Sequence, residues 1–392
     1  MEVVADIGRK RWLILALGVL AQTVQATVVN GTAFLIPTLH TEHGLDLAQA
    51  GTLAGAPILG GVLTLVAWGA IADRFGERNA LAAGLGIASA ATAAAATTTA
   101  PGALAVLLAA AGAGAASANA ASGRVVVGWF PQAQRGLAMG IRQMSVPLGI
   151  ALAAMMMPPL ARDHGIGWAL AFPAIMCGVG AIACAVGIID PPRPDRDTAA
   201  DNGLLDNPYR GSRTLARIHG TSILLVVPQQ MVWTFALVWL VTDLDWTETS
   251  AGLVITASQF LGAIGRVIVG VWSDRTGSRM GPLRIVSISV VVSMAALAAT
   301  AWFASPTAVV MLLVASVTTV APNGLAFTAV AELGGPFWGG RALGIQNTGQ
   351  FVTGAAVGPA FGALIGAVGF PIAFAIAAIA PLAAVPLVPR DE

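Results

Sequence analysis

The decapeptide Gly69-Ala-Ile-Ala-Asp73-Arg74-Phe-Gly76-Glu-Arg78 indicates the architecture of the chain, because the same pattern occurs again later in the sequence. The second copy is Gly270-Val-Trp-Ser-Asp274-Arg275-Thr-Gly277-Ser-Arg279, at an offset of 201 positions (274 − 73). Each copy follows an apolar run that is long enough to cross a bilayer and precedes another such run. Two copies at equivalent places indicate a chain built from two halves of one duplicated design.

The composition is that of a membrane protein. Of the 392 residues 56% are hydrophobic and 10% charged, and the mean hydropathy is +0.80, which excludes an ordinary soluble domain. The net charge of +1 argues against a nucleic-acid partner, which would require a concentrated basic surface. Cys177 and Cys184 lie seven positions apart in one apolar run, so we expect buried packing and not a disulfide.

The apolar runs predict an all-α integral membrane protein with twelve transmembrane helices in two pseudo-symmetric halves of six. A chain of this length accommodates twelve spans of about 20 residues with short loops. The segment 190–216 is rich in Pro, Asp and Arg and is interpreted as a solvated linker between an N-terminal half (1–189) and a C-terminal half (217–392). The predicted spans lie near 12–36, 47–71, 80–99, 102–129, 136–160, 166–189, 217–242, 249–272, 282–304, 308–331, 341–367 and 370–388.

The distribution of basic residues predicts the orientation in the membrane. On the linker side lie 16 of the 20 Lys and Arg residues, against Arg162 alone on the other side. Both termini and the linker are therefore expected to be cytoplasmic, in a multi-pass protein of the cell inner (cytoplasmic) membrane. The outer loops carry acidic residues instead: Glu42, Asp46, Asp163, Asp243, Asp245 and Glu248. The apolar run after Arg9-Lys10-Arg11 shows no convincing cleavage site, so we expect a retained first helix and not a signal peptide.

The repeated pattern G-x-x-x-D-R-x-G-x-R between paired membrane helices resembles the cytoplasmic signature loop of the major facilitator superfamily. The resemblance implies that the Asp residue interacts with the end of a neighbouring helix and that the Arg residues form charge contacts which hold the outward-open state. Glu77 and Ser278 stand where the family commonly has a basic residue. The two implied conformational latches are Gly69, Asp73, Arg74, Gly76 and Arg78, and Gly270, Asp274, Arg275, Gly277 and Arg279.

Three arginines remain inside the predicted spans: Arg124, Arg142 and Arg266. The 19 acidic residues all fall in loops or at the membrane border, so we expect these arginines to lack an acidic partner within the membrane. Even on a lenient scale, an Arg at the centre of a membrane helix costs at least about 2.5–3.5 kcal/mol. The imbalance predicts a water-filled cavity or an anionic ligand.

Arg266 is the strongest candidate for binding a substrate. It lies eight residues before Asp274, which is about 12 Å along the helix and too deep for its side chain to reach the interface easily. Its place resembles that of the substrate-binding Arg in the monocarboxylate and oxalate/formate transporters and in nitrate porters. Nitrate porters have a matching Arg in helix 2, where this chain has Leu65 (73 − 8), which counts against nitrate.

Arg142 and Arg124 are weaker candidates for the same substrate site. Both lie near the inner ends of their spans, so either long side chain could extend to the cytoplasmic interface at modest cost. An intracellular gate or a contact between the two halves is the other interpretation of both residues.

The repeat also aligns polar residues in the two halves. Asn119 aligns with Asn323 at an offset of 204, and Gln25 with Gln230 at 205. A central cavity between two half-domains would need such polar positions. The alternative is that each amide bonds a neighbouring helix and holds the bundle together. The amides predicted to line a substrate site are Gln22, Gln25, Asn119, Gln229, Gln230, Asn323 and Asn347.

These features predict a secondary transporter that moves a small organic anion, with a carboxylate as the expected substrate, by alternating access as a proton symporter or an anion exchanger. The alternative is a proton-coupled multidrug efflux antiporter, which ten Trp residues and the run Met155-Met156-Met157 would suit. A membrane sensor or a channel is a third class.

We expect no enzymatic activity, because the chain shows no P-loop, no His/Cys metal cluster and no catalytic triad. No metal or cofactor is expected. The expected partners are the lipid bilayer, the anionic substrate and protons, and the expected state is a monomer.

Overall fold

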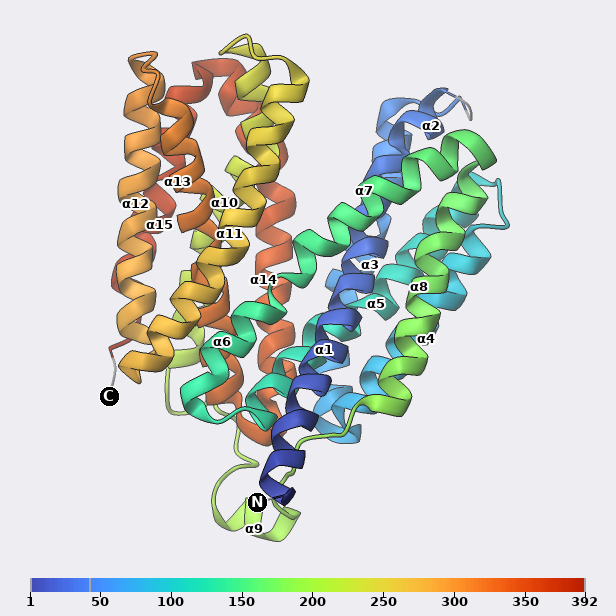
Figure 1. The fold of residues 1–392 in the computed structure, drawn as a ribbon, viewed down its shortest axis with the longest axis vertical. Helices are drawn as coiled ribbons and strands as arrows, with labels where there is room; N and C mark the ends of the chain where they lie inside the picture. Colours follow the sequence, from blue (N-terminus) through green and yellow to red (C-terminus); the bar gives the residue numbers. More distant parts are fainter. Residues whose placement is uncertain (1, 42–43, 391–392) are drawn as a thin grey trace. The chain divides into compact units, whose positions relative to one another are not determined.

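The computed structural model describes residues 2–41 and 44–390, and every regular element in these residues is helical (Figure 1). Glu42, His43, Asp391 and Glu392 lie outside the described residues. The elements of the first sequence half are α1 (Glu2–Gly31), η1 (Thr32–Leu35), α2 (Ile36–Thr41), α3 (Leu47–Phe75), α4 (Glu77–Ala95), α5 (Pro101–Trp129), α6 (Gln132–Arg142), α7 (Ser145–His164) and α8 (Ile166–Gly187). The rest of the chain forms α9 (Arg196–Asp201), α10 (Thr214–Thr242), α11 (Glu248–Thr276), α12 (Met280–Trp302), α13 (Ala308–Val320), α14 (Pro322–Ala377), α15 (Ile379–Ala384) and η2 (Val385–Leu387).

Short sequence signals set the helix ends. Asp46 begins α3 with a capping box, in which its side chain accepts a hydrogen bond from the Gln49 amide while the Gln49 side chain bonds the Asp46 amide. Gly76 separates α3 from α4 with a φ of 92°, and Gly165 separates α7 from α8 with a φ of 88°. Only glycine adopts such angles readily. The second signature loop also turns at a glycine, since Gly277 after α11 has a φ of 66°.

In the described part of the chain, nine helical stretches are long and apolar enough to cross a membrane. One of these, Ala308–Leu387, is 80 residues long and contains three of the twelve predicted spans. The predicted span near 80–99 corresponds to α4, which is 19 residues long and begins with two charged residues. The all-helical, multi-pass fold predicted from the sequence is confirmed.

The long stretch of α14 is interrupted at two glycines. A continuous helix of its 56 residues would measure about 84 Å, far more than a hydrocarbon core of about 30 Å. Gly335 and Gly369 have φ angles of 62° and 79°, which an L-residue rarely adopts and which break the regular helix. These two positions fall between the predicted spans 308–331, 341–367 and 370–388.

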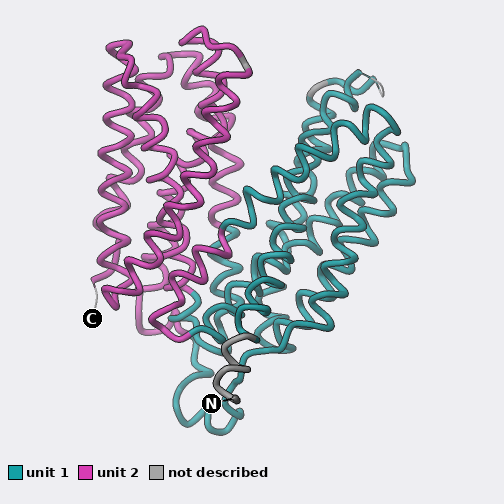
Figure 2. The backbone as a smooth tube through the Cα atoms, viewed as in Figure 1, with its two compact units in different colours: residues 1–130, 144–207, 331–348 teal, residues 131–143, 208–330, 349–392 magenta. Residues whose placement is uncertain are grey.

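The chain divides into two compact units, and each draws on both sequence halves (Figure 2). Unit 1 contains residues 1–130, 144–207 and 331–348, and unit 2 contains residues 131–143, 208–330 and 349–392. In unit 1, α5 packs against α3 and α4, while α1 packs against α7 and α8. In unit 2, α6 packs against α11, and α13 packs against α11 and α12.

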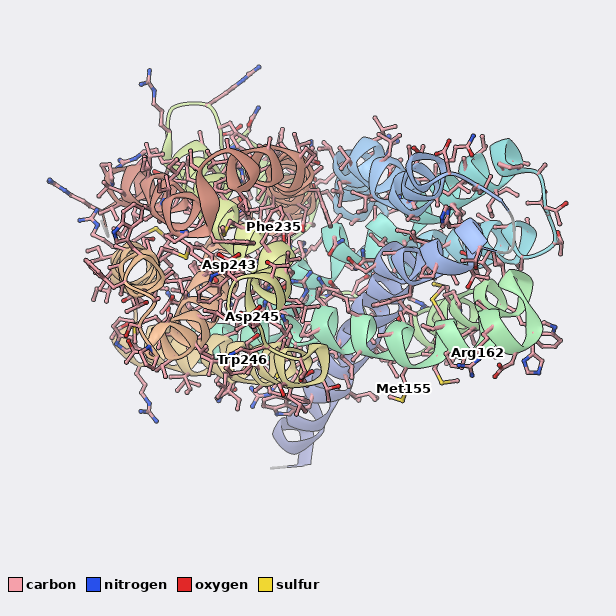
Figure 3. All side chains as sticks on the ribbon, turned by 90° about the horizontal axis from the view of Figure 1, so that it is seen from above. Met155, Arg162, Phe235, Asp243, Asp245 and Trp246 are labelled. Atoms are coloured by element: carbon pink, nitrogen blue, oxygen red, sulfur yellow. The ribbon has the colours of Figure 1, made fainter. Side chains whose placement is uncertain are left out.

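Several charged residues of the predicted loops lie at or just beyond helix ends in the structure. Figure 3 shows Arg162 near the end of α7 in unit 1, and Asp243, Asp245 and Trp246 after α10 in unit 2. Arg162 is exposed and donates to its neighbour Asp163, with 2.7 Å between Nε and Oδ1. An ion pair in such an exposed place contributes little to stability.

Candidate functional site

In unit 1 the carboxylate of Asp73 binds the start of a helix. It accepts hydrogen bonds from the backbone amides of Gly340 (2.7 Å) and Arg341 (3.0 Å) and from Nε of Arg341 (3.0 Å). These amides lie shortly after the break at Gly335, where the helix restarts and its first N–H groups point toward an anion. The Asp73 side chain is 2% exposed, so its contacts are almost free of solvent.

In unit 2 Asp274 makes the equivalent contacts. Its carboxylate accepts hydrogen bonds from the amides of Gly136 (2.9 Å) and Leu137 (2.8 Å) in the first turns of α6, and from Nη1 of Arg279 (2.7 Å). Arg279 also donates to the carbonyl of Gln132. The two signature-loop aspartates therefore each bind the N-terminal part of one helix segment.

Glycines allow these helix segments to approach their partners closely. A Cβ on Gly140 would lie 2.9 Å from the carbonyl oxygen of Arg266, and one on Gly344 would lie 2.6 Å from that of Leu65. Gly136 and Gly340 make similarly close contacts next to Asp274 and Asp73. This role was not predicted from the sequence, although the small-x-x-x-small spacing 136/140 and 340/344 recurs at the offset of 204.

The arginines of the signature loops do not all act in the same way. Arg279 binds Asp274, but Arg78, at the equivalent place, donates from Nε to the carbonyl of Ala185. Arg341 provides the guanidinium beside Asp73 instead. Arg74 and Arg275 are exposed.

Glu77 is the buried centre of a charge cluster in unit 1. Its Oε1 atom lies 2.8 Å from Nε of Arg124 and 2.6 Å from Nη2 of Arg193, and its side chain has no exposed area. The expectation that Arg124 lacks an acidic partner was therefore wrong. It failed because Glu77, the first residue of α4, is buried against Arg124 of α5 and Arg193 of the linker. Arg124 Cδ also lies 3.0 Å from the position of a Cβ on Gly339.

The first part of the linker is packed against unit 1, contrary to the prediction of a solvated segment. Asp190 accepts a hydrogen bond from the Arg78 amide (2.7 Å), and Arg193 donates to the carbonyls of Ala72 and Asp73. Further along the linker, Leu205 accepts a hydrogen bond from the indole of Trp338 (3.1 Å). The helix α9 within the linker is exposed along most of its length.

The linker ends at a Tyr–His contact in unit 2. The hydroxyl of Tyr209 lies 2.9 Å from Nε2 of His219, and the two rings stack at 5.9 Å. Burial raises the pKa of Tyr209 to about 12, so its hydroxyl keeps its proton in the physiological range.

Arg266 lies in the interior of unit 2, as its place in the sequence suggests. It is 4% exposed, its Nη1 donates to the carbonyl of Gln143 (3.2 Å), and its Nε has no hydrogen-bond partner among the described residues. No carboxylate of the described residues lies within ion-pair distance of Arg266. This guanidinium is buried, charged and only partly satisfied.

Arg142 also contacts Gln143 in unit 2. It is 1% exposed, its Nη1 donates to Oε1 of Gln143 (3.0 Å), and its guanidinium lies over the ring of Phe327 at 5.8 Å. A cation above an aromatic face is stabilised by the ring quadrupole. Arg142 and Arg266 therefore meet at Gln143, while Arg124 belongs to the Glu77 cluster of unit 1.

The predicted amides form one matching pair in each unit. In unit 1, Gln22 donates to Oδ1 of Asn119 (3.0 Å), and in unit 2, Asn323 donates to Oε1 of Gln229 (3.0 Å). The contacts make Gln22 and Gln229 equivalent, at an offset of 207, and not Gln25 and Gln230 as the alignment suggested.

The remaining predicted amides lie on the same helices. Asn347 donates to the carbonyls of Leu343 (2.8 Å) and Asn119 (3.5 Å). Gln25 is buried in α1, and Gln230 faces Gly354 of α14. Within the residues that the structure describes, no group of three His, Cys, Asp or Glu side chains could hold a metal ion.

The chain belongs to the Major Facilitator Superfamily. The sequence profile of that family matches residues 15–355 and 221–392. An uncharacterized MFS-type transporter of Mycobacterium tuberculosis strain H37Rv, Rv2994, is 46% identical over 381 residues, which are 97% of this chain and 85% of the relative. The MFS-type transporter MT3072 of strain CDC 1551 is also 46% identical over the same shares. The protein is therefore a multi-pass membrane transporter of this family.

Solved structures show the same fold at low sequence identity. The proton:xylose symporter XylE has a TM-score of 0.75 at 15% identity, with 97% of this chain and 95% of that chain covered. The human organic anion transporter MFSD10 has a TM-score of 0.77 at 15% identity, with 97% and 99% covered. The E. coli fucose:proton symporter FucP has a TM-score of 0.72 at 16% identity, with 95% and 97% covered. At such identities the likeness concerns the fold alone.

Proposed function

We propose that this transporter moves a small organic anion, a carboxylate, and that Arg266 binds the anionic group. The observation that carries the proposal is the state of Arg266, which is 4% exposed, has an Nε without a hydrogen-bond partner and has no carboxylate beside it among the described residues. An arginine in such a place is costly in a membrane protein unless it has a function. A carboxylate ligand would supply the missing charge and acceptor.

The chemistry of the guanidinium supports a carboxylate in particular. Its planar fork of N–H donors matches the two oxygens of a carboxylate, and it stays charged at all physiological pH values. Arg142, which meets Arg266 at Gln143, would add a second cationic group in the same unit. Arg124 is assigned instead to the cytoplasmic charge cluster, because Glu77 already pairs with it.

Alternating access is proposed to operate through the two aspartate contacts. Asp73 joins the first sequence half to residues 340 and 341 of the second, and Asp274 joins the second half to residues 136 and 137 of the first. If the halves 1–189 and 217–392 move against each other about the linker, these contacts must break. The signature loops then act as latches for one state of the cycle.

The amide pairs and a coupling of transport to protons or to a second anion are compatible with alternating access. The pairs Gln22–Asn119 and Gln229–Asn323 occupy equivalent places, and Asn347, Gln25 and Gln230 lie on the same helices, so we propose that these amides offer polar contacts to the substrate during the cycle. A carboxylate can carry its own proton or be exchanged for a second anion. We therefore propose proton symport or anion exchange across the cytoplasmic membrane, with both termini inside.

Transport into proteoliposomes tests the proposal. The full chain is reconstituted, and uptake of radiolabelled acetate, lactate, oxalate and succinate is measured beside uptake of a cationic dye, with and without an imposed proton gradient. We expect saturable uptake of at least one carboxylate and its loss in Arg266→Gln. Arg284→Gln is the matched control, because Arg284 donates to the carbonyls of Val388 and Pro389 near the C-terminus and lies outside the proposed site.

Two outcomes would contradict carboxylate transport. Uptake of a carboxylate that is equal in Arg266→Gln and in the wild type would show that Arg266 is structural. Transport of the cationic dye without transport of any anion would favour the multidrug antiporter instead.

A further inference from the structure

Gln143 lies where the fifth span is broken into two helices. It follows the last residue of α6 and precedes Ser145, the first residue of α7, and it is 7% exposed. Its side-chain oxygen accepts a hydrogen bond from Arg142, and its backbone oxygen accepts one from Arg266. One neutral residue thus contacts both buried guanidinium groups of unit 2.

Pro147 explains why the backbone oxygen of Gln143 can accept a hydrogen bond from Arg266. In a continuous helix this oxygen would accept a hydrogen bond from the amide four residues later. That residue is Pro147, which has no N–H. The carbonyl is left without its helical donor, and Nη1 of Arg266 occupies the place at 3.2 Å.

Gly140 brings the two elements together. Because this residue has no side chain, α6 approaches the backbone of α11 at Arg266 and Val267, where an added Cβ would lie 2.9 Å and 3.0 Å from the nearest atoms. Gln143 follows three residues later, almost one turn along the same helix. Gly140 therefore brings α6 next to Arg266, and Gln143, whose carbonyl lacks a helical donor because of Pro147, accepts a hydrogen bond from Arg266.

The second repeat provides an internal comparison. Gly344 makes the close contact there, but it packs on Leu65, and Asn347 and Phe351 stand where the first repeat has Gln143 and Pro147 (offset 204). Phe351 has an amide N–H, so α14 continues through this place without a break. The close glycine contact thus occurs in both repeats. The two arginines that contact residue 143, whose carbonyl has no helical donor, belong to unit 2.

We infer that Gln143 is a positioning residue that holds Arg142 through its side-chain oxygen and Arg266 through its backbone oxygen, and that its uncharged side chain keeps a competing carboxylate away from Arg266. The inference rests on the proposed anion transport. A glutamate at this position would place a carboxylate at a residue that both guanidinium groups contact, and this carboxylate would compete with the substrate.

Thermal melting and equilibrium binding of purified full-length protein test the inference. The probes are the sodium salts of acetate, lactate, oxalate and succinate. Gln143→Glu is expected to raise the melting temperature without ligand, because a carboxylate is placed near Arg266, whose Nε has no hydrogen-bond partner among the described residues, and to weaken carboxylate binding about tenfold or more. The melting temperature reports the new charge pairing, and the change in carboxylate affinity separates a role in binding from a merely structural one. Gln143→Ala, which keeps the charge of the pair, is expected to weaken binding without the gain in melting temperature.

Gln134→Glu is the matched control, since it makes the same chemical change on α6 at a residue outside the proposed site. It should bind carboxylates as the wild type does. Binding by Gln143→Glu and Gln143→Ala that equals wild-type binding, while Arg266→Gln has lost it, would overturn the inference and leave the proposed function standing. Absence of carboxylate binding in the wild type itself would overturn both.

Discussion

Asp73 and Asp274 occupy equivalent places in the two units: each accepts hydrogen bonds from two successive backbone amides near the start of a helix segment. Each carboxylate also accepts one arginine, but the arginines are not equivalent, since Arg341 lies in the bound helix segment and Arg279 in the signature loop itself. The backbone part of the latch is thus symmetric, and its side-chain part is not.

Asp73→Asn and Asp274→Asn are expected to destabilise the protein by about 1–3 kcal/mol each, because a charged acceptor with buried donors is replaced by a neutral amide. The loss is measured as a lower melting temperature of the purified protein. Asp163→Asn removes the exposed carboxylate beside Arg162 and should change the melting temperature little. Equal effects of the buried and the exposed substitution would contradict a role for the latch contacts.

Gly140→Ala is expected to separate α6 from α11, because the new methyl group would lie 2.9 Å from the Arg266 carbonyl and neither backbone can yield cheaply. Overpacking of this kind costs about 1–3 kcal/mol and should also weaken carboxylate binding. Gly86→Ala is the control, since a Cβ there meets nothing within 4 Å and alanine favours a helix. A Gly140→Ala variant that melts and binds like Gly86→Ala would contradict the close packing.

Pro147→Ala supplies an amide N–H four residues after Gln143. We expect this donor to compete with Arg266 for the Gln143 carbonyl, so that carboxylate binding weakens about tenfold while the net charge of the site is unchanged. Isothermal titration of the variant measures this change. Pro173→Ala makes the same substitution inside α8 of unit 1 and should leave binding as it is.

Arg193→Gln is expected to lower stability by about 1–3 kcal/mol, because the side chain donates to the Ala72 and Asp73 carbonyls and to the buried Glu77. Arg196→Gln, three residues later in the same linker, is the control, since Arg196 is exposed. Limited proteolysis of the linker offers an independent measurement. Faster cleavage in Arg193→Gln than in Arg196→Gln would show that Arg193 fastens the linker, and equal cleavage would count against it.

The sequence predicted the fold well because its signals are local. Apolar runs report helices one at a time, and the repeated loops around Asp73 and Asp274 report the duplication directly. The burial of Arg266 could also be predicted, since it lies eight residues along the helix from Asp274, the predicted membrane border, which is about 12 Å.

The pairing of Arg124 could not be predicted in the same way. The sequence places Glu77 in the signature loop, and only the packing of α5 and Arg193 around it shows that it is buried. The meeting of Arg142 and Arg266 at Gln143 likewise depends on the distance between two helices. The recurring glycine spacing at 136/140 and 340/344 was the one signal in the sequence that pointed to this close approach.

The contact between Asp73 and Gly340 spans 267 positions of the chain. During synthesis, the helices that make up most of unit 1 emerge long before residues 331–348, which complete it. Asp73 must therefore remain without these amide donors until nearly the whole polypeptide has been translated. An N-terminal half expressed alone would keep this carboxylate unmatched, and supplying the C-terminal half as a separate chain is the way to complete it.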